Sequence, residues 1–315
     1  MCNASNTNSI NGVIITGATG AIGIALTKLL SAKKIPVLAV IRKDSSRRKY
    51  IDGIPNVKVL ECDLSDFEKL ELDRSERYDA IFDLAWEGSN QGARQDPNIQ
   101  KKNVDHIKAI IDFAQRSGCT TFIGAGSQAE YGRVCGRINE DFPLNPLSEY
   151  GKAKLQVENL SRDLCRSKGI RYIWTRIFSV YGPGMGMDSL ITYSISEFMK
   201  GNSPKMTKGE QLWDFLYADD AAAALYLLAS NETAEGVYCI ASGEGKSIKE
   251  YSEIIRDAVN PEIKLQLGAV PYQENQVMEL VGDISKLKKE TGFMVSIPFD
   301  IGIKRMVEWM KSEIQ

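Results

Sequence analysis

A short apolar run followed by a glycine-rich segment constrains the fold of this chain more than any other feature. Val13-Ile14-Ile15 leads directly into Thr16-Gly17-Ala18-Thr19-Gly20-Ala21-Ile22-Gly23. Apolar residues then recur at near-helical spacing, at Ile22, Ala25, Leu26, Leu29 and Leu30. This order predicts a buried strand, a tight turn and a helix. Glycines let the backbone turn and approach a diphosphate closely, and the helix N-terminus offers N–H groups to the anion. Such junctions also occur without any ligand, so the segment alone leaves that alternative open.

Strand-like and helix-like segments alternate through the first half of the chain. Apolar strand-like runs cover residues 37–41, 57–61, 80–84, 121–124 and 172–177, and helical patterns cover 20–33, 97–117 and 149–168. A later strand is predicted at 236–241 and an amphipathic helix at 299–311. This alternation predicts an α/β fold of Rossmann type, a doubly wound parallel sheet with helices on both faces. Ligands bind at the carboxyl ends of the strands in such sheets.

The pattern loosens after Tyr181-Gly182-Pro183-Gly184, where Gly, Pro, Met and Lys become frequent. We therefore predict a cofactor-binding domain of residues 1–180 with about 215–242. The remaining segments, about 181–214 and 243–315, are predicted to build a smaller C-terminal substrate-binding lobe.

Charge and composition exclude several classes of protein. The net charge of −2 gives no sign of a nucleic-acid-binding surface, and no apolar stretch is long enough to span a membrane. The six cysteines are scattered without a C-x-x-C pair, which favours thiols in a reducing cytoplasm. His106 is the only histidine, so a histidine base or a multi-histidine metal site is not expected. We predict a cytoplasmic protein without a metal centre.

Tyr150 and Lys154 stand four residues apart in a predicted helix, which places them one turn apart on one face. A tyrosine has a pKa of about 10 and needs help to act as an acid or base at neutral pH. A cation one turn away favours the phenolate by direct attraction. The plain alternative is a surface tyrosine and lysine at a helix start.

Ser127 follows the predicted strand 121–124, at the edge where a doubly wound sheet places its site. Its hydroxyl can hold a substrate carbonyl against the tyrosine. A serine in a loop is also a common turn former. The glycine segment, Ser127 and the Tyr150–Lys154 pair occur in this order, and their combination carries more weight than any one of them.

Together these motifs resemble the extended short-chain dehydrogenase/reductase family of nucleotide-sugar epimerases, dehydratases and reductases, over nearly the whole chain. The spacing Gly-x-x-Gly-x-x-Gly is the form seen in short-chain dehydrogenases/reductases. Further segments resemble family motifs in order, namely Asp63-Leu64, Gly126-Ser127-Gln128-Ala129-Glu130-Tyr131-Gly132, Arg176–Gly184, Trp213–Asp220 and Gly236–Ala241.

The resemblance implies a nicotinamide dinucleotide, a nucleotide-sugar substrate, and Ser127, Tyr150 and Lys154 as catalytic residues. Helices near 97–117 and 149–168 form a four-helix dimer interface in many relatives, which implies a homodimer. Residues implied for the substrate are Trp86, Ser127, Gln128, Ser179, Met185 and Trp213. Residues implied for the cofactor are Gly17, Thr19, Gly20, Ala21, Ile22, Gly23, Arg42, Asp63, Leu64, Leu84, Ala85, Tyr150, Lys154, Ile177, Ser179 and Val180.

Departures from family motifs narrow the expected chemistry. Gln128-Ala129 stands where 4,6-dehydratases carry Asp-Glu after the catalytic threonine, so dehydration is disfavoured. Ala129 also stands where 3,5-epimerase/reductases carry a cysteine, and their histidine has no counterpart. Hydride transfer with proton relay at one carbon remains, as in a 4-keto reductase or a 4-epimerase.

The strand 37–41 ends in Arg42-Lys43, where an acidic residue would bind the ribose hydroxyls of NAD. Arginine suits a phosphate, so NADP(H) is favoured, with NAD(H) possible. The alternative is that Arg42 merely starts a solvated loop. Because a reductase consumes NADPH whereas an epimerase retains NAD, Arg42 favours NADPH-dependent reduction of a 4-keto group.

The alternatives are an NAD-dependent nucleotide-sugar 4-epimerase and, more distantly, a non-catalytic NADP(H) sensor. The segments Trp213–Asp220 and Gly268–Tyr272 also resemble bacterial NDP-4-keto-6-deoxyhexose reductases, including those making 3,6-dideoxyhexoses such as abequose. Several family members bind the substrate diphosphate with an arginine at the position of Trp213 and another near Gln273. We therefore expect a different diphosphate contact here, or a substrate that is not a standard nucleotide sugar.

Overall fold

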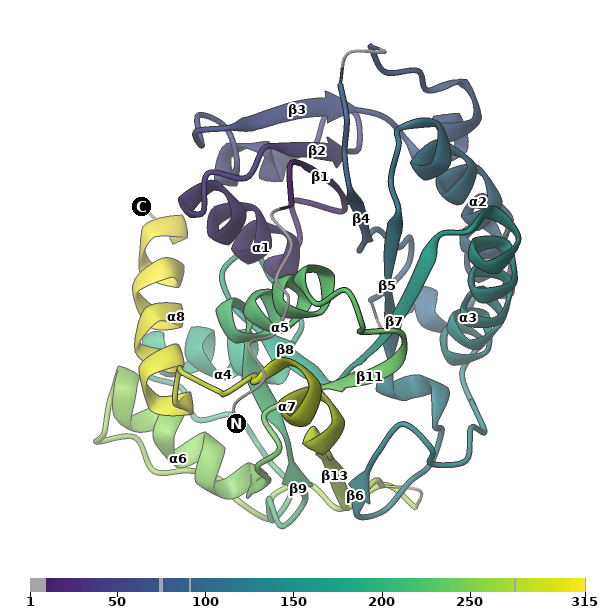
Figure 1. Cartoon of the computed structure of the whole chain (residues 1–315). Helices are drawn as coiled ribbons and strands as arrows, with labels where there is room; N and C mark the ends of the chain where they lie inside the picture. Colours follow the sequence, from purple (N-terminus) through teal and green to yellow (C-terminus); the bar gives the residue numbers. More distant parts are fainter. Residues whose placement is uncertain (1–9, 74–75, 91, 275, 315) are drawn as a thin grey trace, which may run out of the picture.

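The structure, a computed structural model, describes residues 10–73, 76–90, 92–274 and 276–314. Its centre is a seven-stranded parallel sheet with the strand order β11-β7-β5-β4-β1-β2-β3 (Figure 1). The order reverses between β1 and β4, as in the doubly wound sheet that the alternation predicts. The strands are β1 (Val13–Thr16), β2 (Val37–Ile41), β3 (Val57–Glu61), β4 (Ala80–Asp83), β5 (Thr121–Ser127), β7 (Arg171–Ile177) and β11 (Gly236–Ile240).

Helices cover both faces of this sheet (Figure 1). Helices α1 (Ala21–Ala32) and α5 (Ala218–Ser230) pack on one face, where Leu26 and Leu225 belong to one buried cluster. Helices α2 (Pro97–Arg116) and α3 (Glu149–Lys168) pack on the other face with Phe122 of β5. Strands β1 and β2 are buried along their whole length, because a parallel sheet covered on both faces has no solvent side.

A second group of helices packs around an apolar core of its own. Helices α4 (Leu190–Met199), α6 (Ile248–Val259) and α8 (Phe299–Ile314) contribute Ile195, Ile255 and Met306 to it. Helix α7 (Ser285–Thr291) instead packs against α5 and β11. Two small sheets, β10-β8 and β12-β9-β13-β6, complete the fold. They consist of β6 (Arg137–Ile138), β8 (Ser179–Tyr181), β9 (Leu212–Trp213), β10 (Phe215–Tyr217), β12 (Lys246–Ser247) and β13 (Glu279–Gly282).

Side-chain hydrogen bonds cap the N-termini of helices α2 and α3. The Asp96 carboxylate accepts hydrogen bonds from the backbone N–H groups of Asn98 and Ile99, at 2.9 and 3.3 Å, at the start of α2. The Ser148 hydroxyl accepts one from Gly151 N–H at 3.0 Å at the start of α3. The first turn of α3, which carries Tyr150, is therefore anchored.

Strand β5 is longer than predicted. The expected strand ended at Gly124, but the pairing continues to Ser127, opposite Ile177 of β7. Gly124 and Gly126 lie against the indole of Trp174, where a Cβ at either position would collide with the ring. The small residues that make this fit possible also hide the apolar pattern by which strands are recognised. Within the described ranges, no helix is long and apolar enough to cross a membrane.

Candidate functional site

The three glycines of the first turn have different structural roles. Gly17 has a φ of +68°, and a Cβ there would lie 2.8 Å from the backbone of Leu84 and Ala85. A Cβ on Gly23 would overlap the carbonyl oxygen of Gly17. At Gly20 a Cβ would meet only that carbonyl oxygen, at 3.5 Å, so packing leaves space there. Because no side chain caps the N-terminus of α1, its N–H groups and this space fit a diphosphate.

The carboxyl ends of the strands open into a cleft of about 2290 Å³. Single small-molecule sites measure about 300–1,000 Å³, so this cleft has room for a dinucleotide and a substrate together. Among the residues predicted for the substrate, Trp86, Ser127, Gln128, Ser179, Met185 and Trp213 all line it. Among those predicted for the cofactor, it is lined by Gly17, Thr19, Gly20, Ile22, Arg42, Asp63, Leu64, Leu84, Ala85, Tyr150, Lys154, Ile177, Ser179 and Val180.

Two residues predicted for the cofactor, Ala21 and Gly23, do not line the cleft. Ala21 is the first residue of α1, and Gly23 is buried in its first turn. Gly23 lies against the backbone of Gly17 and Ala18, so its role here is close packing between the helix and the turn.

The three residues predicted to be catalytic meet on one wall of the cleft. Ser127 is the last residue of β5, and Tyr150 and Lys154 lie one turn apart on α3. All three are buried, with exposed fractions of 8%, 8% and 3%. The side chains of Ser127 and Tyr150 lie close enough to interact, and the Ser127 hydroxyl lowers the pKa of the tyrosine, which favours its phenolate form.

The Lys154 ammonium lies over the Tyr150 ring, on the face that the helical spacing predicts, but its closest contacts are with other residues. Its Nζ donates a hydrogen bond to the carbonyl oxygen of Ala125 at 2.6 Å and lies 3.4 Å from the centroid of the Trp86 ring. The centroid of the Tyr150 ring is 5.8 Å away. Burial lowers the pKa of Lys154 to about 7, although the carboxyl groups of Asp83 and Glu130 oppose this.

A different cation lies on the Tyr150 ring. Cζ of Arg94 is 4.1 Å from the centroid of the Tyr150 ring. Burial raises the pKa of Tyr150, and Arg94 is the largest of the influences that lower it. Arg94 belongs to no motif of the sequence, so sequence reasoning had no signal for it. Its position depends on the folded connection between β4 and α2.

A buried carboxyl group lies where the sheet order reverses. The Thr16 hydroxyl at the end of β1 donates a hydrogen bond to Asp83 at the end of β4, at 2.6 Å. Burial raises the pKa of Asp83, and Thr16 and Lys154 oppose the rise. Sequence reasoning missed this residue, although an acid at the end of an apolar strand is a signal of its own.

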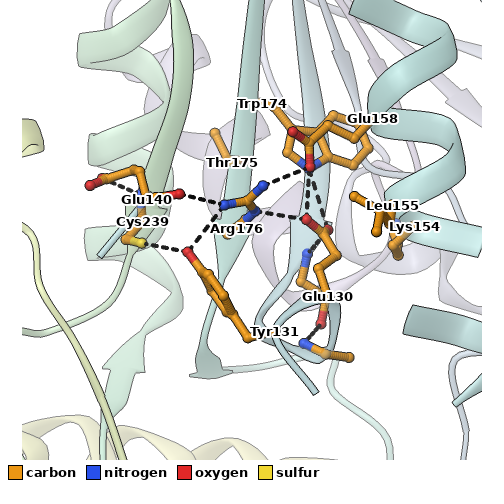
Figure 2. A network of polar contacts seen from close by, with 12 residues as sticks. Glu130, Tyr131, Glu140, Lys154, Leu155, Glu158, Trp174, Thr175, Arg176 and Cys239 are labelled. Atoms are coloured by element: carbon orange, nitrogen blue, oxygen red, sulfur yellow. Dashed lines mark hydrogen bonds and ion pairs between the residues drawn. The ribbon is translucent and has the colours of Figure 1, made fainter. Parts of the chain in front are cut away.

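A buried network of ion pairs and hydrogen bonds surrounds Arg176 (Figure 2). Arg176 of β7 lies between Glu130 and Glu158, with its Nε 2.9 Å from Glu130 and its Nη2 2.9 Å from Glu158. Glu130 also accepts a hydrogen bond from the backbone N–H of Ser127 at 2.7 Å and one from Trp174. Burial raises the pKa of Glu130 to about 7, and Arg176 opposes this rise. The network therefore fixes the backbone of Ser127.

Trp213, which stands where the resemblance implies an arginine for the diphosphate, makes a hydrogen bond in the cleft. The indole N–H of Trp213 donates a hydrogen bond to the Ser179 hydroxyl at 2.7 Å. The next residue, Asp214, is buried and accepts hydrogen bonds from the backbone N–H groups of Ser242, Gly243 and Gly282. This aspartate ties β9 to β13 and to the segment that follows β11.

The family follows from comparison with known sequences. Residues 13–241 match the model of the NAD dependent epimerase/dehydratase family. The chain belongs to this family. It is therefore an enzyme of a family that depends on a nicotinamide dinucleotide, and the open turn at Gly20 fits the diphosphate of that cofactor.

Curated relatives include both reductases and epimerases. The chain is 24% identical over 302 residues to the CDP-abequose synthase of Salmonella typhimurium, covering 94% of this chain and 97% of the relative. It is 24% identical over 317 residues to the dTDP-4-dehydro-6-deoxyglucose reductase of Escherichia coli, covering 95% and 97%. The solved UDP-glucose 4-epimerase of Thermus thermophilus, a complex with NAD, has the same fold, with a TM-score of 0.81, 21% identity and coverage of 95% and 98%.

Proposed function

We propose that this enzyme reduces the 4-keto group of a nucleotide-linked 6-deoxyhexose with NADPH. The observation that carries the proposal is the position of Ser127 and Tyr150 together in one cleft. Gln128 and Ala129, which follow Ser127, cannot ionise, so the acid and base that 4,6-dehydratases carry at these two positions are missing.

The cleft residues have different roles in such a reduction. The bound dinucleotide supplies the hydride. Ser127 donates a hydrogen bond to the substrate carbonyl oxygen, and Tyr150 transfers its phenolic proton to that oxygen. The negative charge left on Tyr150 is stabilised by nearby donors and cations, and electrostatic stabilisation of this kind is commonly the largest contribution in such sites.

The test is oxidation of NADPH by the purified protein in the presence of nucleotide-linked 4-keto-6-deoxyhexoses. We expect stoichiometric loss of NADPH and formation of the alcohol. Tyr150→Phe should lower kcat by about 10²–10⁴-fold, the usual contribution of general acid catalysis, while the Kd for NADPH stays nearly unchanged. A variant that retains most of its rate would remove Tyr150 from the mechanism.

The choice of NADPH rests on the charges at the end of β2. Arg42 and Arg47 line the cleft, and neither makes an ion pair with any described residue. The neighbouring Lys43 and Arg48 are paired, with Asp66 at 3.2 Å and with Glu61 at 2.6 Å. The two unpaired guanidinium groups suit the additional phosphate of NADP.

Arg42→Ala is therefore expected to remove most of the preference for NADPH over NADH. The measurement is the ratio of the two dissociation constants, obtained by fluorescence titration. Arg48→Ala is the matched control, because this arginine is already paired with carboxylates and should leave the ratio unchanged. Equal affinity of the wild-type protein for NADH and NADPH would contradict the assignment.

A second candidate is an NAD-dependent nucleotide-sugar 4-epimerase, which the likeness to the Thermus thermophilus epimerase with NAD supports. An epimerase returns the hydride to the same sugar. Isomerisation of a nucleotide hexose without net change of cofactor would identify it, whereas stoichiometric consumption of NADPH identifies a reductase.

The proposal assigns the two groups of elements to different ligands. Residues 1–180 with about 215–242 bind the dinucleotide, and about 181–214 with 243–315 form the lobe that binds the nucleotide sugar. Two copies of the chain associate through α2 and α3, which pack against each other and carry the exposed Leu160.

A further inference from the structure

The connection between β4 and α2 places two side chains on Tyr150. The guanidinium of Arg94 covers the ring, with Cζ 4.1 Å from its centroid. Trp86 meets the same ring edge-on, with centroids 5.7 Å apart and planes at 78°. Tyr150 is thus enclosed by a cation and an aromatic ring from one short segment. Arg94 lines the same cleft as Ser127 and Lys154.

This segment is held by α2. The buried side chain of Gln100 donates hydrogen bonds to the carbonyl oxygens of Gly88 and Ala93, both at 2.9 Å, and accepts one from the Trp86 indole at 2.9 Å. Asn103 donates a hydrogen bond to the carbonyl oxygen of Glu87 at 3.0 Å. The backbone that precedes Arg94 is therefore anchored to α2, which fixes the place of Arg94 over Tyr150.

The Arg94 guanidinium has no ion-pair or hydrogen-bond partner among the described residues. No described carboxylate lies within ion-pair distance of it, and it makes no hydrogen bond to another described residue. The other cation near the site, Lys154, is turned toward Ala125 and Trp86. A guanidinium over an aromatic face is attracted to the neutral ring, and more strongly to the anion that remains when the phenol loses its proton.

Three further groups act on Tyr150 and Lys154. Ser127 of β5 lowers the pKa of the Tyr150 phenol, and Glu130 raises it. Lys154 lies on the same helix, and Asp83 of β4 raises the pKa of this lysine. Burial is the largest influence raising the pKa of Tyr150, and Arg94 is the largest influence lowering it. Glu130 and Arg94 therefore act on the phenol in opposite directions.

We propose that Arg94 is a positioning residue that holds the Tyr150 ring and stabilises its phenolate during proton transfer. The inference rests on the proposed function. In the step, the Tyr150 O–H bond breaks and its proton forms a bond to the substrate carbonyl oxygen, while hydride from NADPH forms the new C–H bond. NADPH is oxidised, the carbonyl carbon is reduced, and the electron pair of the broken O–H bond stays on Tyr150 opposite Arg94.

The test compares Arg94→Gln and Arg94→Lys with Lys101→Gln. Lys101 lies on α2, is not part of the cleft lining and has a side chain that is 72% exposed, so its loss controls for the removal of a positive charge alone. Arg94→Gln should lower kcat by about 10- to 100-fold, somewhat less than the loss of a direct oxyanion donor. The Kd for NADPH should stay within about twofold, because Arg94 acts through Tyr150. Arg94→Lys should recover part of kcat, and Lys101→Gln should match the wild type.

Two pH measurements separate this role from a merely structural one. In the reverse direction, alcohol oxidation uses the phenolate as base. The acidic limb of the pH–rate profile of this oxidation should therefore move to higher pH in Arg94→Gln. Ultraviolet absorbance of the phenolate, taken as the difference between each protein and its Tyr150→Phe counterpart, should show the same displacement without any turnover.

Several outcomes would overturn the inference. One is an unchanged kcat and pH profile in Arg94→Gln. Another is a higher KM for the sugar with kcat intact, because Arg94 would then bind substrate. Circular dichroism shows whether Arg94→Gln folds. If it does not, the acidic limb of the pH–rate profile of Arg94→Lys tests the inference instead. Failure of the proposed function can be told apart from failure of this inference. If the proposed function is wrong, the wild-type protein binds NADPH but reduces no keto sugar. The absorbance titration needs no turnover and still measures the effect of Arg94 on Tyr150.

Discussion

The three glycines of the first turn illustrate how identical residues acquire different roles. Gly17 and Gly23 are required by the backbone, since a Cβ at either position would collide with neighbouring main-chain atoms. Gly20 adopts an extended conformation with φ −80° and ψ 166°, which any residue can adopt. It leaves space above the N-terminus of α1. The lack of a side chain at Gly20 is therefore important for ligand binding and not for packing.

A matched pair of substitutions separates these roles. Gly23→Ala should destabilise the protein by about 1–3 kcal/mol, the usual cost of overpacking. Gly20→Ala should leave the melting temperature close to that of the wild type but weaken NADPH binding, because its methyl group occupies the diphosphate space. Thermal denaturation and fluorescence titration measure the two effects. If Gly20→Ala binds NADPH normally, the diphosphate does not lie at this turn.

Lys154 gives the site a pH dependence. Its pKa is lowered to about 7 by burial, so the ammonium is present below that pH and is lost above it. A neutral amine cannot stabilise negative charge on Tyr150, so kcat/KM, which reports the free enzyme, should fall on the alkaline side with a midpoint near that value. Arginine stays protonated, so Lys154→Arg should remove this limb even if its overall rate is low. A wild-type profile flat to high pH would exclude Lys154 as the responsible group.

At the scale of elements, the Glu130–Arg176–Glu158 network joins the turn after β5 to β7 and α3 (Figure 2). The three side chains are nearly inaccessible, with exposed fractions of 0%, 2% and 3%. Removing one partner of a buried ion pair leaves uncompensated charge in an apolar interior. Because Glu130 also holds the Ser127 backbone, the network supports both the sheet and the site.

Arg176→Met should therefore destabilise the protein by about 3–5 kcal/mol at neutral pH. Glu130, whose pKa burial raises, would bind a proton more readily in the folded variant than in the unfolded chain. The variant should consequently regain stability as the pH falls toward about 5, a direction given by linkage. Urea denaturation across this pH range measures the effect. Lys101→Gln, which removes an exposed ion pair with Asp105, is the control and should change stability by less than about 1 kcal/mol.

At the scale of the whole molecule, the cleft depends on how the α4–α6–α8 group is held against the sheet (Figure 1). Asp214 receives backbone hydrogen bonds from the segment after β11 and from β13, and so fixes β9 at the rim. Trp213 is thereby placed against Ser179 at the start of β8. This part of the cleft lining is thus assembled from three distant parts of the chain.

The proposed homodimer uses the outer face that α2 and α3 cover. Leu160 on α3 is 39% exposed, and a buried charge at this position would oppose association. We expect Leu160→Glu to shift the protein from dimer toward monomer in sedimentation equilibrium. Met294→Glu changes a 76% exposed residue outside α2 and α3, and should leave the mass unchanged. A wild-type protein that sediments as a monomer at all concentrations would contradict the proposal.

Much of the fold could be predicted from the sequence because its signals are local. The apolar run before the glycines, the alternation of strands and helices, and the Tyr150–Lys154 spacing depend on near neighbours, and the structure has these elements within a few residues of the predicted bounds. The exception is β5, whose last residues are too small to carry an apolar pattern.

The tertiary structure decided what each site residue faces. Helical spacing places Lys154 near Tyr150, but the direction of its ammonium depends on Ala125 and Trp86, which lie on other elements. Likewise, only the folded β4–α2 connection brings Arg94 onto the phenol. The periodicity of apolar residues in the sequence predicts which residues are buried and where helices, strands and turns form. The charges around a buried hydroxyl depend on contacts between segments distant in sequence, and no local pattern encodes them.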